Sequence, residues 1–153
     1  MTVSSSDADE PSLSLVSQDD PFFEELLDVR YKLLRKPLGM ALGSERNKLD
    51  QSSIHLALMR NSKVVACVSL CCKGEYCGKV FQMAVDRDLQ NKGFGLKLMR
   101  GLVDHAKSND IKSLWLNARS EAMRFYERAG FSETGAFFIE VGVIHKRMEL
   151  NLD

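Results

Sequence analysis

The sequence lacks a long apolar run: no stretch approaches the about 20 residues that a membrane-spanning helix needs. It also lacks an excess of either charge, since 21 Lys and Arg residues balance 21 Asp and Glu residues among 153. This balance argues against broad electrostatic binding of nucleic acid or of an anionic membrane. Because Met1 to Ser12 is polar and acidic, we expect no signal peptide and a cytoplasmic location.

The four cysteines include no Cys-x-x-Cys pair, and no histidine tract follows them. Zinc sites depend on such ligand spacing, so the sequence predicts no metal site. The cysteines gather in one apolar stretch, at Cys67, Cys71, Cys72 and Cys77. We expect them to be reduced side chains of a buried strand, where a thiol packs as a small apolar group.

The length suits one domain, which we place at residues 12–153 behind a disordered tail at residues 1–11. Asp20-Pro21 predicts the start of a helix that ends at Pro37 and Gly39. Residues 38–53 are irregular, and either a short second helix or a mobile segment fits them; such a segment either covers a site or simply connects elements. Four strands, with short connections that predict antiparallel pairing, are expected at Leu13–Ser17, Ile54–Met59, Lys63–Cys72 and Lys79–Val85.

The second half of the chain alternates helices and strands. A helix at Gly95–Ser108 should connect strand Lys79–Val85 to a parallel strand at Ser113–Asn117. Ser120 is expected to cap a short helix that ends before Gly130, with Phe131 folding back onto it. Two final strands are expected at Glu133–Val141 and Val143–Leu150, joined near Gly142. The predicted class is therefore α/β with a mixed, mostly antiparallel sheet of about six to seven strands and about four helices.

Between strand Lys79–Val85 and the following helix lies a Gln-x-x-Gly-x-Gly turn, Gln90 to Gly95. Its glycines allow backbone angles that a Cβ forbids and allow another molecule to approach the main chain. The free N–H groups and the dipole at the start of the helix favour a phosphate there. An ordinary strand-to-helix turn explains the same residues equally well when they are taken alone.

Three features together resemble the GCN5-related N-acetyltransferase (GNAT) superfamily. They are strand Phe81–Val85, the turn Gln90–Gly95 and the segment Ala122–Phe131. The resemblance covers about residues 12–150 and is strongest over residues 81–131. Val29–Gly39 and Glu140–Met148 resemble, more loosely, a subgroup of small, mostly bacterial members. The resemblance implies a sheet that splays between its fourth and fifth strands.

The resemblance also implies acetyl-CoA as the co-substrate. Main-chain N–H groups of the glycine turn would hold its pyrophosphate, with added charge from Lys92, and the fourth strand would contact the pantetheine arm through Met83 and Val85. Plain core packing is the alternative explanation for these strand residues. The expected cofactor-binding residues are Met83, Ala84, Val85, Gln90, Asn91, Lys92, Gly93, Phe94, Gly95, Leu96, Asn117 and Tyr126.

For catalysis, the resemblance implies direct attack of an amine on the thioester, with Tyr126 protonating the leaving thiolate. A neutral attacking amine is required, so a base is expected, and Glu140 and His145 in the final hairpin are the candidates. A core aromatic at Tyr126 and a structural histidine at His145 are the alternatives. Two positions depart from the family pattern: Ile144 replaces a proline, and Arg119 replaces an asparagine.

Three functions are compared. The first is an N-acetyltransferase acting on a primary amine of a small molecule or peptide, and the second is a CoA-binding module of the same fold without turnover. The third is a nucleotide-binding α/β domain, in which Asp110 would be the acidic residue downstream of the turn. A homodimer is possible, and His55 and His105 are expected to take no part in the chemistry.

Overall fold

The computed structural model describes residues 10–74 and 76–153. The tail expected to be disordered lies outside the described residues up to residue 9. Its last residue, Pro11, is buried, and its carbonyl accepts a hydrogen bond of 2.7 Å from Lys97 Nζ. No helix within the described ranges is long and apolar enough to cross a membrane.

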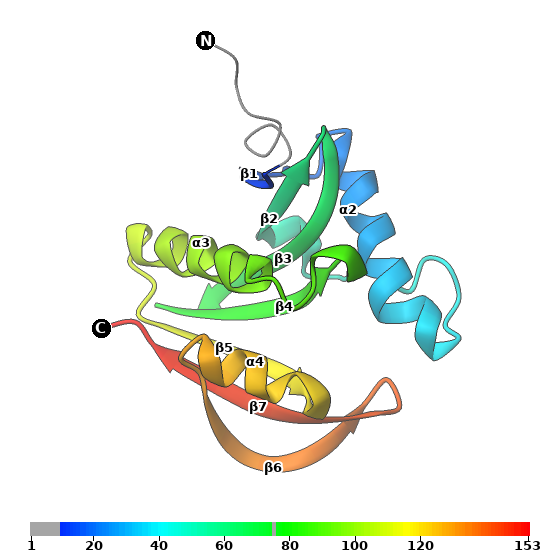
Figure 1. Ribbon diagram of the computed structural model, residues 1–153. Coiled ribbons are helices and arrows are strands. Elements are labelled where there is room, and N and C mark those ends of the chain that lie inside the picture. Colours follow the sequence, from blue (N-terminus) through cyan, green and yellow to red (C-terminus); the bar gives the residue numbers. More distant parts are fainter. Residues whose placement is uncertain (1–9, 75) are drawn as a thin grey trace.

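One sheet of seven strands forms the centre of the molecule, in the order β1-β2-β3-β4-β5-β7-β6 (Figure 1). The strands are β1 (Ser12–Leu15), β2 (Ser53–Arg60), β3 (Lys63–Gly74), β4 (Cys77–Val85), β5 (Ser113–Arg119), β6 (Ser132–Glu140) and β7 (Val143–Asn151). Among the described strands, β4 and β5 are the single parallel pair and all other pairs are antiparallel. The predicted mixed, mostly antiparallel sheet is confirmed, and a doubly wound nucleotide-binding domain is excluded.

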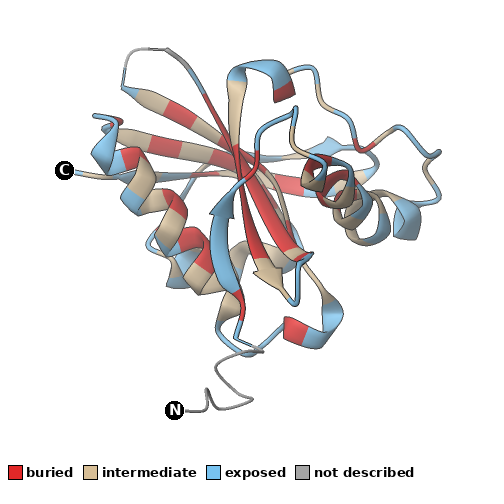
Figure 2. Ribbon diagram, turned by 90° about the horizontal axis from the view of Figure 1, so that it is seen from above, coloured by how far each residue is buried: buried red, intermediate tan, exposed pale blue. Residues whose placement is uncertain are grey.

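Helices cover both faces of this sheet. Helix α2 (Phe22–Arg30) packs on one face through a core cluster that includes Leu26 and Cys67. Helices α3 (Phe94–Ser108) and α4 (Met123–Arg128) contact the larger cluster on the other face, which includes Leu102 and Leu114. Figure 2 shows buried residues concentrated along the central strands and the inner sides of the helices. Both faces of β3 are therefore buried, as its continuous apolar sequence predicted.

The helix predicted to end at Pro37 and Gly39 changes its winding on the way. After α2 the chain continues as a π-helical segment, η1 (Tyr31–Arg35), and a 3₁₀ turn, η2 (Lys36–Leu38). It ends at Gly39, where φ is +72°. The predicted start at Asp20-Pro21 is one residue early, since Pro21 is the N-cap residue and α2 begins at Phe22, whose N–H donates a 2.9 Å hydrogen bond to Asp20 Oδ1.

Residues 38–53 hold turns and one 3₁₀ turn, η3 (Asp50–Ser52), so the alternative of a short second α-helix there is not realised, and the described chain has three α-helices. One expectation about the next helix is wrong. Ser120 begins a 3₁₀ turn, η5 (Ser120–Ala122), and α4 starts only at Met123 with no side-chain cap. The end of α4 matches the prediction, since Gly130 has φ of +103° and Phe131 packs against Tyr126.

Candidate functional site

Strands β4 and β5 stay paired over only three residue pairs. The last pair is Lys79 with Trp115, and beyond it the two strands diverge (Figure 1). A cavity of about 760 Å³ opens where they part, lined by β4, β5, the end of the first helix and the final hairpin. The β4 main-chain groups beyond Lys79 that point away from β3 thus have no β5 partner in the described chain, and this edge is open to an extended ligand carrying amides.

A bulge lies in β4 beside this opening. Ser69 is paired with Phe81 and Cys67 with Ala84, so Gln82 and Met83 together oppose a single residue of β3. Gln82 has φ of +48°, an angle that is uncommon for a residue with a Cβ. The bulge redirects the main chain of β4 at the wall of the cavity, where Gln82 and Met83 both line it.

The glycine turn follows β4 directly and precedes α3. Gly93 is the residue before the helix and has φ of +87°, and a Cβ there would meet no atom within 4 Å, so the turn is open to an incoming molecule. Gly95 faces inward, where a Cβ would lie 2.9 Å from Phe125 Cε1. No side chain caps the start of α3. Its first N–H groups are therefore available to an anion.

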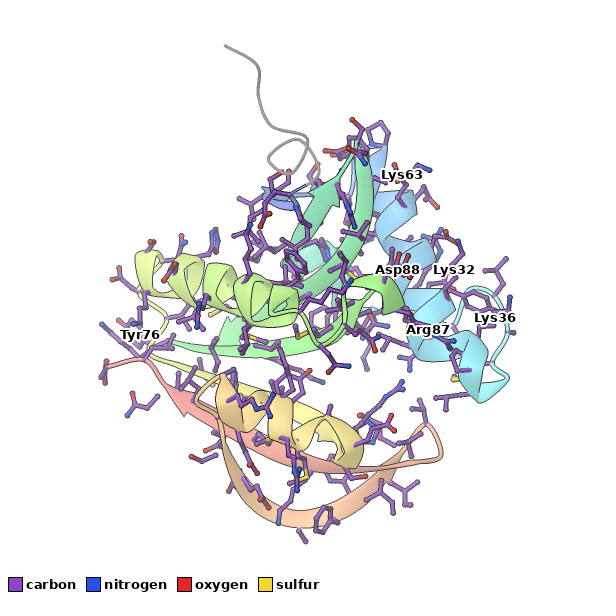
Figure 3. All side chains as sticks on the ribbon, in the orientation of Figure 1. Lys32, Lys36, Lys63, Tyr76, Arg87 and Asp88 are labelled. Carbon is purple, nitrogen blue, oxygen red and sulfur yellow. The ribbon has the colours of Figure 1, made fainter. Side chains whose placement is uncertain are left out.

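Gln90 connects the turn to the strand. Its Nε2 donates a 2.8 Å hydrogen bond to the carbonyl of Val85, the last residue of β4. Figure 3 shows Arg87 and Asp88 on the intervening turn, beside the helix that carries Lys32 and Lys36. Arg87 and Gln90 line the large cavity. The start of the turn thus adjoins the free edge of β4.

Tyr126 of α4 lines the same cavity, although its ring is partly buried between Phe125 and Phe131. Burial raises the pKa of its hydroxyl to about 12, against a smaller opposing effect of the Arg119 charge. The hydroxyl has no hydrogen-bond partner in the described chain. Tyr126 therefore stays protonated at neutral pH, with an O–H group available for donation.

His145 of β7 is buried, and its two nitrogens have different surroundings. Nδ1 lies 2.8 Å from the Val143 carbonyl, which can only accept, so Nδ1 carries the proton. Nε2 lies 3.7 Å from Glu140 Oε2. Both side chains line the cavity, so Nε2 of His145 lies next to a carboxylate within the site.

A buried arginine lies behind the cavity. Arg30, at the end of α2, is fully buried and donates two hydrogen bonds of 3.0 Å to the carboxylate of Asp50. It also donates to Ser69 Oγ at 2.8 Å, and its guanidinium lies 5.7 Å from the centre of the Phe81 ring. This bidentate ion pair fixes the end of the irregular segment 38–53 against the sheet.

His55 completes this cluster as a neutral group. Its Nε2 lies 3.1 Å from the Asp50 carbonyl and therefore donates, which leaves Nδ1 to accept from Ser69 Oγ at 2.6 Å. Burial is the main cause of the lowered pKa of His55, and the charge of Arg30 adds to it. That His55 takes no part in the chemistry stays a prediction. Its role in this buried network was not predicted from the sequence.

The structure brings most of the predicted site residues together. Those that line the large cavity are Met83, Ala84, Val85, Gln90, Asn117, Tyr126, Glu140 and His145. The remaining ones occupy the adjoining turn and the first turn of α3; they are Asn91, Lys92, Gly93, Phe94, Gly95 and Leu96. Among the cavity residues not predicted as site residues are Gln82, in the bulge, and Arg35, at the end of η1. The loose match of Val29–Gly39 to a family subgroup pointed to the region of Arg35.

Comparisons with known proteins agree with this geometry. The family model described as an Acetyltransferase (GNAT) domain matches residues 38–152. A [ribosomal protein bS18]-alanine N-acetyltransferase of Haemophilus influenzae is 27% identical over 124 residues, which are 79% of this chain and 83% of the relative. The sequence similarity thus includes the turn, α4 and the final hairpin.

Solved structures show the same fold. An acyl-CoA N-acyltransferase from Pseudomonas aeruginosa superposes with a TM-score of 0.80 at 18% identity, covering 92% of this chain and 99% of that one. An aminoglycoside 6'-N-acetyltransferase in complex with coenzyme A superposes with a TM-score of 0.77 at 12% identity, covering 93% and 97%. At these identities the match concerns the fold alone.

Proposed function

The chain belongs to the GNAT acetyltransferase family and is an acyl-CoA-dependent N-acetyltransferase, and we propose that it moves an acetyl group from acetyl-CoA to a primary amine. The acceptor would be a small molecule or a peptide that attacks the thioester directly. The observation that carries this proposal is the parting of β4 and β5 next to an uncapped helix start. An acyl-CoA needs an open strand edge for its amides and free helix N–H groups for its pyrophosphate.

In this proposal the pyrophosphate lies on the main-chain N–H groups of residues 90–96. Gly93 leaves the turn open, and Lys92 is exposed where it can add charge. The pantetheine amides would pair with the main-chain groups of β4 at Met83 and Val85, where the Val85 carbonyl also accepts from Gln90, with Asn117 on the opposite wall. The non-catalytic CoA-binding module is less well supported, because the cavity also holds a proton donor and a proton acceptor.

The bulge in β4 supports a role for main-chain N–H groups at the reacting carbonyl. When the amine attacks, the thioester oxygen gains negative charge, and a fixed N–H group nearby stabilises it.

Gln82 Oε1 is buried and has no hydrogen-bond partner in the described chain, so it is available to a donor group of a bound ligand. Substrate contact at this point would satisfy an otherwise unpaired polar atom.

Proton transfer would use the two ends of the cavity. A lysine-like amine has a pKa of about 10.4, so a base must take its proton before or during attack. His145 Nε2, close to Glu140, is suited to accept that proton, directly or through water. Tyr126 would donate its proton to the departing thiolate, because its raised pKa keeps it protonated. The proposal also includes two predictions, a cytoplasmic location and a homodimer.

The first test is the melting temperature with and without acetyl-CoA. A ligand at 100 times its Kd stabilises by about 2.7 kcal/mol, which is a shift of a few degrees for this size. NAD and ATP serve as controls and should give no comparable shift. A shift with acetyl-CoA, followed by thiol release when amines are added, supports the transferase. No shift at millimolar acetyl-CoA argues against any acyl-CoA function of this cavity.

A further inference from the structure

Two arginines lie on one wall of the large cavity. Arg35 comes from the end of η1, and Arg119 is the last residue of β5. Arg119 Nη2 donates a 2.8 Å hydrogen bond to the carbonyl of Leu34, the residue that precedes Arg35. This bond holds Arg119 against the main chain beside Arg35, although the two arginines are 84 positions apart in the sequence.

Neither guanidinium has a salt-bridge partner in the described chain. Arg35 Nε bonds to the main-chain oxygen of Ser44 at 3.2 Å, and Arg119 bonds only to a main-chain oxygen. Each guanidinium carries five N–H donors, so most of their donors remain unused. The pKa of Arg35 is lowered, first by burial and then by the positive charge of Arg119, against smaller opposing effects of Glu140 and Glu45. Two partly buried like charges that make no direct ion pair with a carboxylate are stabilised when an anion binds between them.

The charge of the whole cavity has the same sign. Of the described residues that line it, Arg35, Lys79, Arg87 and Arg119 are basic and Glu121 and Glu140 are acidic. Lys79 is already engaged, with its Nζ 5.0 Å from the centre of the Trp115 ring. The unmet positive charge is therefore concentrated at Arg35 and Arg119, and a cationic acceptor such as a polyamine would be repelled there.

The arginines lie next to the proton-accepting pair. Arg119 is the register partner of His145 across β5 and β7, and His145 Nε2 lies 3.7 Å from Glu140 Oε2. Side chains of directly opposed residues begin about 4.5–5.5 Å apart. A molecule with an amine and an anionic group separated by a few bonds can therefore reach both places at once.

We propose that the acceptor is an amine that carries a carboxylate, held by Arg35 and Arg119 while its amine faces His145 and Glu140. The inference depends on the proposed acetyl transfer and specifies its substrate class. The carboxylate comes either from a free amino acid or from an acidic side chain near a peptide N-terminus. A guanidinium pair recognises both through the same charge-assisted hydrogen bonds.

The first experiment compares acceptors that differ only in charge. Thiol release from acetyl-CoA is measured with amino acids against their amides, with Ala-Glu-Ala amide against Ala-Gln-Ala amide, and with butane-1,4-diamine. An amide group lowers the pKa of the neighbouring amine, so more of the amino acid amide is neutral and intrinsically reactive at neutral pH. We expect the carboxylate to be preferred at least tenfold in kcat/KM in one series, and the preferred series identifies its source. Equal or better use of the amides and the diamine overturns the inference and leaves the transferase intact.

The second experiment tests the two arginines directly. Arg35→Gln and Arg119→Gln should each raise the KM for the carboxylate acceptor at least tenfold, and Arg119→Lys should recover part of that loss. The melting shift with acetyl-CoA should be unchanged, which separates the acceptor site from the cofactor site and from misfolding. Arg124→Gln, on the exposed side of α4, is the matched control. An unchanged KM in both variants overturns the assignment.

A third measurement does not depend on turnover. Calorimetry of the CoA complex with malonate should show binding that disappears in the Arg35→Gln/Arg119→Gln double variant. If CoA binds and malonate does not, the anion site is refuted while the cofactor site stands. If neither acetyl-CoA nor CoA binds, the proposed function itself fails.

Discussion

Arg30 and Gln82 donate hydrogen bonds to the same atom, the main-chain oxygen of Glu45, at 3.1 and 3.0 Å. Arg30 belongs to the buried ion pair with Asp50, whereas Gln82 is the residue of positive φ in the β4 bulge. The buried network therefore extends through Glu45 to the wall of the cavity. It holds residues 45–50 in a fixed position relative to the bulge.

Replacement of Arg30 should be among the most destabilising changes in the chain. Arg30→Met leaves the Asp50 carboxylate buried without its partner, which costs about 3–5 kcal/mol for such pairs. Urea denaturation measures the loss. Lys32→Met, which removes the exposed ion pair of Lys32 with Asp28, is the matched control and should cost less than about 1 kcal/mol. Equal effects of the two variants would contradict the role given to the buried pair.

Tyr126→Phe should slow acetyl transfer and leave cofactor binding nearly unchanged. The ring packing against Phe125 and Phe131 is kept, while the proton donor to the thiolate is lost. General acid catalysis contributes about 10²–10⁴-fold, so we expect kcat to fall at least about 100-fold. Steady-state thiol release measures kcat, and the melting shift with acetyl-CoA reports binding. Retention of full kcat would assign Tyr126 to packing alone.

Gly93→Ala should weaken acetyl-CoA binding. An alanine at φ of +87° is strained, and its methyl group would stand in the open space where a phosphate is proposed to lie. Gly39→Ala is the control, because Gly39 has a similar φ of +72° and equally open surroundings but lies outside the turn. Calorimetry with acetyl-CoA should show at least a tenfold rise in Kd for the first variant only. A similar Kd for both variants would leave the turn as architecture.

Stability should fall at alkaline pH because of Cys67. Burial raises the pKa of this thiol from 9.0 to about 12 in the folded protein. Above pH 9 the unfolded thiol loses its proton while the folded thiol keeps it, so the folded state loses stability as pH rises toward 12. The expected slope is about 1.4 kcal/mol per pH unit for one group. Urea midpoints between pH 8 and 10.5 measure it.

Cys67→Ala should flatten this limb between about pH 9 and 10, since it removes the group that titrates there; above pH 10, Tyr126, whose pKa is also raised to about 12, adds its own loss of stability. Cys72→Ala is the comparison, because Cys72 is exposed on the same strand. A limb that persists unchanged in Cys67→Ala would place the effect on other groups.

Local sequence patterns predicted the fold well. Short connections indicated antiparallel strands, the helix between β4 and β5 required a parallel pair, and the glycines marked the turn before α3. The pairing, the splay and the left-handed Gly130 all follow from interactions between near neighbours or from the family resemblance. These features depend on few residues, so the sequence expresses them directly.

The buried network could not be read in the same way. Asp50 and Ser69 lie 20 and 39 positions from Arg30 in the sequence, and no local period connects them. The bulge at Gln82 and the π-helical winding of η1 depend on how distant segments pack. The same is true of the Arg35 and Arg119 pair, which exists only because Arg119 reaches the main chain beside Arg35.

Three residue pairs between β4 and β5 hold together two halves of the sheet that are each continuous in sequence. Strands β1 to β4 occupy residues 12–85, and β5 to β7 occupy residues 113–151. During synthesis the first half can pair completely before the second half has been made. A ligand whose amides lie between β4 and β5 would then act as an eighth strand, joining two separately formed ladders into one.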